Sequence, residues 1–201
     1  MIRRDLLKVS IAAAALGGTL PARGATQCDS DGTPAQFVPK RAPDPKAFEN
    51  DIAKYPKCPY CGMDRKQFHH SRMLVQYGDD LPDAVCSLHC TAISLAINVD
   101  RDPRAVWVGD NAAPGETKPL VAVDKAVFLV GSSIPGVMTA RSKVAYGSRD
   151  AAKAAQAANG GEVVDFDQAL LAAYTDMSTD VARIRKNRAE RRKSAMEHKG
   201  G

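Results

Sequence analysis

The chain has 201 residues, enough for one domain or two small ones. Its hydrophobic fraction of 44% and charged fraction of 25% are ordinary globular values, which excludes a wholly disordered, collagen-like or coiled-coil chain. The net charge of +5 is unevenly placed: residues 1–24 carry four basic residues and one acid, and residues 183–199 carry eight basic residues and two acids. The residues between are net acidic, so the overall charge does not indicate a nucleic-acid-binding protein.

Residues 1–24 have the pattern of an export signal. A charged start that includes Arg3-Arg4 precedes an apolar stretch at 9–20, which is too short to span a bilayer. Residues 22–24 (Ala-Arg-Gly) form a small-x-small cleavage site. The arginine pair, with Leu-Leu-Lys at 6–8, favours twin-arginine export over ordinary secretion. We therefore expect a periplasmic protein whose mature chain has no transmembrane segment.

After a flexible lead-in at 25–47, rich in Pro, Gly, Asp and Lys, the first predicted unit covers residues 48–110. Alternating and apolar runs predict three strands and one helix in this unit. Ser87 is a good residue to begin the helix and Asn98 to end it. The strands are expected at 72–77, 84–86 and 105–108, and the helix at 88–97.

The second predicted unit covers residues 111–176 and follows a Pro- and Gly-containing loop at 111–118. Ser148 is expected to cap its first helix, and Asp165 with Gln168 forms a capping box for its second. The strands are expected at 120–123, 126–130, 142–146 and 162–164, and the helices at 149–158 and from Asp165 to about Asp176.

Both units run in the order of strands, a Ser-capped helix and a strand. This weak repeat predicts an α+β fold of two small ββαβ-type units packed together, because neither unit alone would bury much core. A basic tail at 177–201, with a separate charged helix over 178–197, completes the chain. The tail lacks aromatic residues between its charges, which favours a solvated segment over one that contacts acidic lipid or a partner.

Four of the five cysteines lie within 33 residues, at Cys58, Cys61, Cys86 and Cys90. Structural disulfides are one explanation for an exported protein, although five cysteines leave one unpaired. A thiol redox site is a second, because Cys-Pro-Tyr-Cys is a glutaredoxin dipeptide signature. Against it, no buried strand precedes the motif, and Gly62, a poor helix opener, follows it.

A metal site is the third explanation for this cluster. The spacing of two, 24 and three residues between successive cysteines suits a zinc-ribbon-like or treble-clef-like site with four thiolates. Met63, two residues after Cys61, adds a thioether, and soft sulfur ligands select Cu(I). Zinc rarely takes a Met ligand. On spacing alone, a ligand role and core packing, which is the usual role of a single Met, remain equal alternatives for Met63.

Nearby residues add to the candidate site. Cys90 is expected in the first turn of a helix, where the helix dipole favours its thiolate. His89 lies in the same turn and is expected at the surface or behind the ligands. His69 and His70 precede a strand, so at most one of them faces the cysteines.

Several segments in this order resemble the NosL family, the accessory proteins of nitrous oxide reductase. The resemblance covers about residues 48–176 and is carried by the segments Cys61-Gly-Met63, 72–77, 85–92, 136–147 and 160–166. It implies a two-unit ββαβ architecture and a periplasmic protein that binds one Cu(I) and passes it toward the copper sites of that reductase. It also implies that Cys61 and Met63 carry the metal.

The chain departs from the best-known members of this family in two respects. Those are lipoproteins, whereas Cys28 follows Gln27 and lacks a lipobox. They also need not carry the additional thiols of Cys58, Cys86 and Cys90, which are expected to complete a sulfur-rich copper site, to form a disulfide or to hold a separate zinc. Met138, in the Gly-Val-Met-Thr stretch, is expected to be a loop or core residue.

The resulting hypothesis is a non-enzymatic Cu(I) carrier that exchanges ligands with a copper-receiving enzyme or another accessory protein. The alternative is an interaction module with structural zinc or disulfides and no metal traffic. An organomercurial-lyase-like enzyme, a fold reported as related to the family, is disfavoured because no positioned acid accompanies the cysteines.

Overall fold

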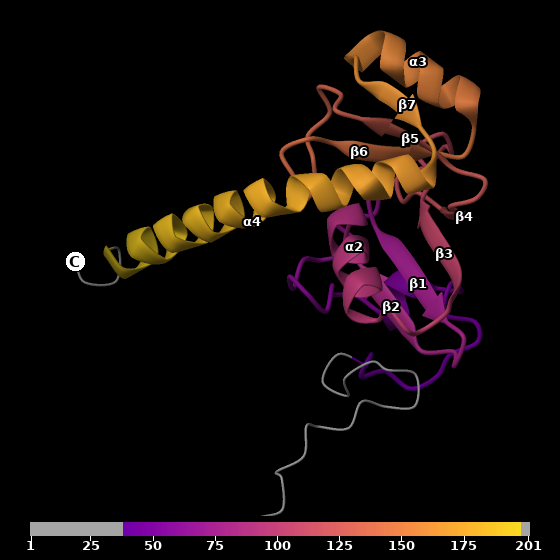
Figure 1. Ribbon diagram of the computed structural model, residues 1–201, viewed down its shortest axis with the longest axis horizontal. Helices are drawn as coiled ribbons and strands as arrows, with labels where there is room; N and C mark the ends of the chain where they lie inside the picture. The colour runs from indigo at the N-terminus through magenta and orange to yellow at the C-terminus, as the bar shows by residue number, and fades with distance from the viewer. Residues whose placement is uncertain (1–37, 198–201) are drawn as a thin grey trace, which may run out of the picture.

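The computed structural model describes residues 38–197. The expected export signal, Cys28, most of the lead-in and the end of the tail lie outside these residues. Two antiparallel sheets lie one beyond the other, and a long helix crosses between them and extends past the body (Figure 1). The expected α+β fold is confirmed. Among the helices of residues 38–197, none combines the length and the apolar character that a membrane span requires.

The first sheet has the strand order β2-β1-β3-β4. Its central strand β1 is buried along its whole length, because helix α2 covers one face and the segment around α1 covers the other. Met73 and Tyr77 face α2, whereas Leu74 packs with Tyr55. The elements are α1 Asp51–Lys54, β1 Met73–Tyr77, β2 Pro82–Val85, α2 Leu88–Ile97, β3 Pro103–Gly109 and β4 Leu120–Ala122.

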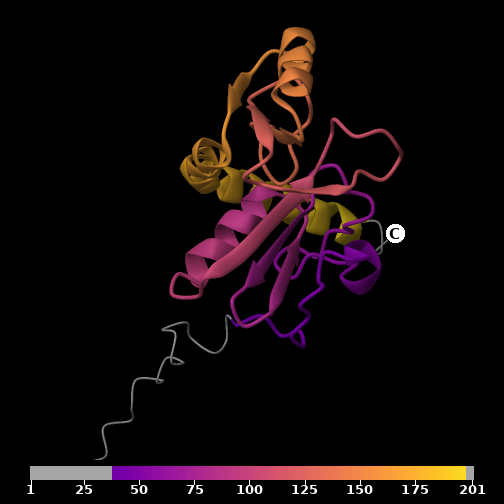
Figure 2. The same cartoon turned by 90° about the vertical axis from the view of Figure 1, so that its right-hand side faces the viewer.

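The second sheet is smaller and has the order β6-β5-β7, with α3 packed on it (Figure 2). Ser148 accepts a hydrogen bond on its side chain from the backbone N–H of Ala151, so it caps α3 as predicted. The elements are β5 Val127–Val130, β6 Lys143–Tyr146, α3 Arg149–Asn159 and β7 Glu162–Val164.

Helix α4, Phe166–Glu197, begins at the predicted capping box, in which Asp165 and Gln168 each accept a backbone hydrogen bond from the other. It packs against β5 and α2, and its C-terminal half projects from the body (Figure 1). The expected break before a separate helix at 178–197 does not occur: α4 is continuous over 32 residues.

One strand pairs differently from what chain order suggests. β4 lies in the range 111–176, yet its residues Leu120, Val121 and Ala122 pair with β3 of the first sheet. The main core also joins the two halves, since Met73 and Val85 of the first sheet share a cluster with Phe128 and Val164 of the second. Cys58, Cys86 and Cys90 belong to this shared core, and Cys61 and Met63 pack against it.

Candidate metal centre

The four clustered cysteines meet in space. Their Sγ atoms all lie within 4.8 Å of one another, and no two are joined as a disulfide. Cys58 and Cys61 come from the turn that precedes β1, Cys86 directly follows β2, and Cys90 lies in the first turn of α2. This is the only group of three or more possible His, Cys or carboxylate ligands within residues 38–197.

The Cys58–Met63 turn is closed by its own backbone. The N–H of Gly62 donates to the carbonyl of Cys58 at 2.9 Å, and the N–H of Cys58 donates to the carbonyl of Met63 at 3.0 Å. Gly62 has a φ of 76°, which a residue with a side chain rarely adopts. The Cys-Gly-Met order therefore allows the tight turn that places Cys61 and Met63 beside the same neighbouring thiol.

That thiol is Cys86, which lies at the centre of the sulfur contacts. Its Sγ is 3.3 Å from the Sγ of Cys61, 3.8 Å from that of Cys90 and 3.9 Å from the Sδ of Met63. A metal–thiolate bond of about 2.3 Å gives sulfur–sulfur separations of about 3.8 Å in a tetrahedral site. The cluster therefore needs little rearrangement to enclose one metal ion.

Burial divides the sulfur atoms into two groups. Cys58, Cys86 and Cys90 are at most 2% exposed. Cys61 and Met63 are only half-buried, and with Met138 they line a cavity of about 380 Å³ whose other wall is α4. A smaller cavity of about 190 Å³ adjoins Cys61 and Cys90 and is also walled by α4. The cluster therefore opens outward through the Cys-Gly-Met turn.

Met138 was expected to be a loop or core residue, and it is a loop residue that packs against the main core. Its backbone has a φ of 63°, an uncommon conformation for a residue with a side chain. Its position in both cavities, beside Cys61, makes it a neighbour of the sulfur cluster that the spacing of the sequence did not indicate.

The thiols do not share charge as the sequence predicted. Hydrogen bonds donated by Cys61, Cys86 and Cys90 lower the pKa of Cys58 far below its usual range. The pKa of Cys90 is raised, first by its hydrogen bond with Cys58. The pKa of Cys61 is also lowered: Cys58 opposes this shift, but Cys86 and Cys90 outweigh it. The expectation that the start of α2 favours a thiolate at Cys90 is therefore wrong for the metal-free cluster, because negative charge is favoured on the turn that carries Cys58 and Cys61 and not at Cys90.

The histidines stand outside the ligand group. His89 is buried rather than at the surface, its Nδ1 lies 3.9 Å from a carboxylate oxygen of Asp180, and burial lowers its pKa. His69 accepts a hydrogen bond on Nδ1 from the backbone of Lys118, and His70 stacks edge-on against it. Neither His69 nor His70 belongs to the group of sulfur ligands.

The sequence model of the NosL family matches residues 49–173, more than half of the chain. The chain belongs to the NosL family. The expected family is thereby confirmed. NosL is not an enzyme family, so its membership confirms the expectation of a non-enzymatic protein.

Two solved structures are similar to the chain. The crystal structure of the copper chaperone NosL from Shewanella denitrificans is 21% identical, covers 65% of this chain and 94% of its own, and has a TM-score of 0.48. The solution structure of apo-NosL from Achromobacter cycloclastes is 27% identical, covers 47% of this chain and 82% of its own, and has a TM-score of 0.34. No functionally curated protein matches the chain.

Proposed function

We propose that this chain binds Cu(I) at its sulfur cluster in the periplasm and delivers it for the assembly of nitrous oxide reductase or a similar copper enzyme. The observation that carries the proposal is the position of Cys61 and Met63. They combine a thiolate and a thioether, the soft ligands that Cu(I) prefers, at the open side of the cluster. Membership of the NosL family supports the same role.

Delivery proceeds by ligand exchange, with no change in the oxidation state of copper. Cys61 and Met63 bind the ion, and Cys86 is close enough to both to serve as a third sulfur. Such a site is not saturated, so a receiving protein can add its own methionine or histidine from the side of the cavity. The buried thiols of Cys58 and Cys90 complete a sulfur-rich environment behind the ion.

A structural zinc site is the second candidate. Its support is the approach of four thiols to within 4.8 Å of one another, three of them buried, because closed zinc sites are built from four such ligands. Zinc bound by all four would hold the turn at Cys58 against β2 and α2, and its removal would loosen the fold. The two candidates differ in the sulfurs that they need: zinc requires Cys90 and Cys58 but not Met63.

Anaerobic titration with Cu(I) against a chromophoric chelator, and separately with Zn(II), tests the proposal. We expect one tightly held Cu(I), abolished in Cys61→Ser and weakened about tenfold or more in Met63→Leu, which keeps the apolar volume but removes a soft ligand. Cys28→Ser and Met177→Leu are matched controls, since Met177 is half-buried like Met63 but lies away from the cavity.

Unchanged Cu(I) affinity in Met63→Leu would contradict the copper site. A chain that holds Zn(II) as purified, unfolds when zinc is removed and is indifferent to Met63 would instead support the structural alternative. Circular dichroism of the metal-free chain supplies this second readout, because a copper carrier has to stay folded after it gives up its ion.

A further inference from the structure

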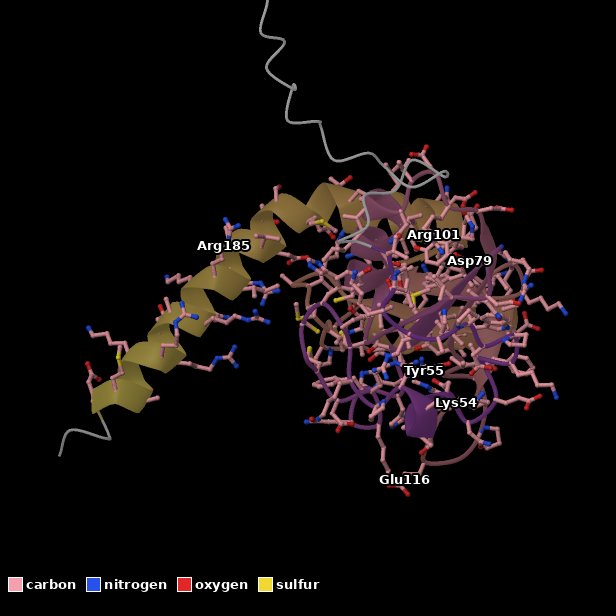
Figure 3. All side chains as sticks on the ribbon, turned by 90° about the horizontal axis from the view of Figure 1, so that it is seen from below. Lys54, Tyr55, Asp79, Arg101, Glu116 and Arg185 are labelled. Carbon is pink, nitrogen blue, oxygen red and sulfur yellow. The ribbon has the colours of Figure 1, made fainter. Side chains whose placement is uncertain are left out.

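Helix α4 turns one face toward the sulfur cluster and continues that face past the edge of the body. Val181 and Ile184 of this face pack near Cys90, at the smaller cavity. The next positions on the same face, at helical spacing, are Arg185, Arg188 and Arg191. Figure 3 shows Arg185 on the part of α4 that leaves the globular body. We call these three arginines the arginine face.

The arginine face is available to a partner. All three residues are exposed. Within residues 38–197, none of their guanidinium groups forms an ion pair or a hydrogen bond, whereas the neighbouring Arg183 pairs with Asp180. Three unpaired cations within two turns of a helix repel one another, and a complementary negative surface would relieve that repulsion.

The arginine face also lies at the opening of the proposed copper site. Arg188 and Arg191 line the larger cavity together with Cys61 and Met63, and Arg185 and Arg188 line the smaller one. Any protein that reaches Cys61 to exchange copper therefore approaches alongside this part of α4. The tail is thus not only a solvated segment, as its composition suggested, because its first turns form a wall of the site.

We propose that the arginine face docks an acidic surface beside the copper-binding residues of the protein that exchanges copper with this chain. The inference rests on the proposed function, since it assigns the docking contact for that exchange. Guanidinium groups pair with carboxylates through two parallel hydrogen bonds, which fixes orientation as well as position. Opposite charges also steer the encounter and raise its rate.

The charge of the remaining chain supports an acidic protein partner. Residues 25–182 carry sixteen basic residues and twenty acids, so they repel an acidic protein, while the arginine face attracts it. The partner is therefore oriented toward the cavity of Cys61 and Met63. A membrane is a weaker fit, because a surface-bound helix needs large apolar residues beside its basic ones, and residues 185–197 contain no aromatic residue and no Leu, Ile or Val.

The test measures Cu(I) transfer from the loaded full chain to synthetic peptides by stopped-flow mixing. One peptide carries methionines flanked by glutamates, and its counterpart carries glutamines in their place. The variant is the triple charge reversal Arg185→Glu, Arg188→Glu and Arg191→Glu. The matched control reverses three exposed cations far from the cavity, Lys125→Glu, Arg149→Glu and Lys153→Glu, and so gives the same net charge.

We expect the unmodified chain and the control variant to transfer Cu(I) to the glutamate peptide about tenfold faster than to the glutamine peptide at low salt. This advantage should disappear at about 0.5 M salt and in the arginine variant. Equal rates to both peptides, or an advantage that survives in the arginine variant, would overturn the inference.

Two further measurements separate the alternatives. Sedimentation with phosphatidylglycerol vesicles tests a membrane partner: vesicle binding that is lost in the arginine variant, with an unchanged peptide advantage, would overturn the docking of a protein. Anisotropy of the labelled glutamate peptide on the metal-free chain needs no copper. A chain that takes up no Cu(I) refutes the proposed function alone, and a metal-free chain that binds both peptides equally refutes the docking alone.

Discussion

The substitution Asp51→Asn tests how the turn that carries Cys58, Cys61 and Met63 is held. The carboxylate of Asp51 accepts hydrogen bonds from Arg65 at 2.8 Å and from Arg72 at 2.9 and 3.1 Å. The side chain of Arg65 is fully buried, and it also donates to backbone carbonyls. The acceptors are the carbonyl oxygens of Asp51, Tyr55, Met73 and Val85.

These contacts hold the cysteine-bearing turn in place against the neighbouring strands. Arg65 follows the Cys58–Met63 turn in the chain, and its bond to the carbonyl of Val85 attaches that turn to the residue before Cys86. Burial lowers the pKa of Arg65, and the charge of Asp51 opposes this effect. Asparagine removes the opposing charge and leaves two buried guanidinium groups to share a neutral side chain.

Removing one partner of a buried ion pair costs about 3–5 kcal/mol of unfolding free energy. The remaining carbonyl acceptors of both arginines limit the loss, so we expect about 4 kcal/mol, or a fall in Tm of about 12 °C for a chain of this size. Urea unfolding followed by circular dichroism measures it. Lys57→Gln, which breaks an exposed pair with Asp64, is the control and should change nothing measurable. A loss below about 1 kcal/mol in Asp51→Asn would refute the reasoning.

Two further predictions concern titration. Burial raises the pKa of Asp83 above its ordinary 3.8, so its contribution to stability is present below that value and is lost as the pH rises through the folded-state pKa. Asp83→Asn should therefore gain stability relative to the unmodified chain between about pH 4 and 7, and a constant difference in urea unfolding would contradict this. Zn(II) bound by all four thiols should release about two protons, because the pKa values of Cys86 and Cys90 are raised while those of Cys58 and Cys61 are lowered. Cu(I) on Cys61 and Met63 should release at most about one, because the only thiol in that ligand pair already has a lowered pKa. Calorimetry in buffers of different ionisation enthalpy counts them, and equal counts for the two metals would be inconsistent with different ligand sets.

Local signals in the sequence were sufficient for most elements of the fold. The helix at 88–97 and the strand at 162–164 were predicted to the residue, and the capping box at Asp165 begins α4 as expected. Ser87 begins α2 in an extended conformation, although its side chain makes no capping hydrogen bond. Such starts and stops depend on the backbone preferences of a few adjacent residues, which a single sequence contains.

The predicted elements differ from the structure where the end of a helix or the partner of a strand depends on packing between segments far apart in the sequence. The tail at 177–201 was predicted to be separate from the preceding helix because its residues become more charged. In the structure, most of these charged residues lie on the exposed side of the same helix. Val181 and Ile184 extend the packed face, so α4 continues. Likewise, nothing local distinguishes β4 as a partner of β3, and Asp51, Arg65 and Arg72 carry no spacing signal because they meet only in the folded chain.

The spacing of the cysteines predicted a metal cluster, but it did not indicate which sulfur atoms a partner can reach. Their burial in the structure shows this. Three thiols are enclosed by the core, while the turn at Gly62 leaves Cys61 and Met63 at the cavity. On the proposed function, a receiving protein has to displace Met63 and Cys61 first, because they are half-exposed whereas Cys58, Cys86 and Cys90 are at most 2% exposed. The order in which copper loses its ligands is then set by access rather than by the strength of each copper–sulfur bond. Cys86 contacts Cys61 and Met63 at the cavity and the buried Cys90, so it is the last sulfur from which the ion dissociates.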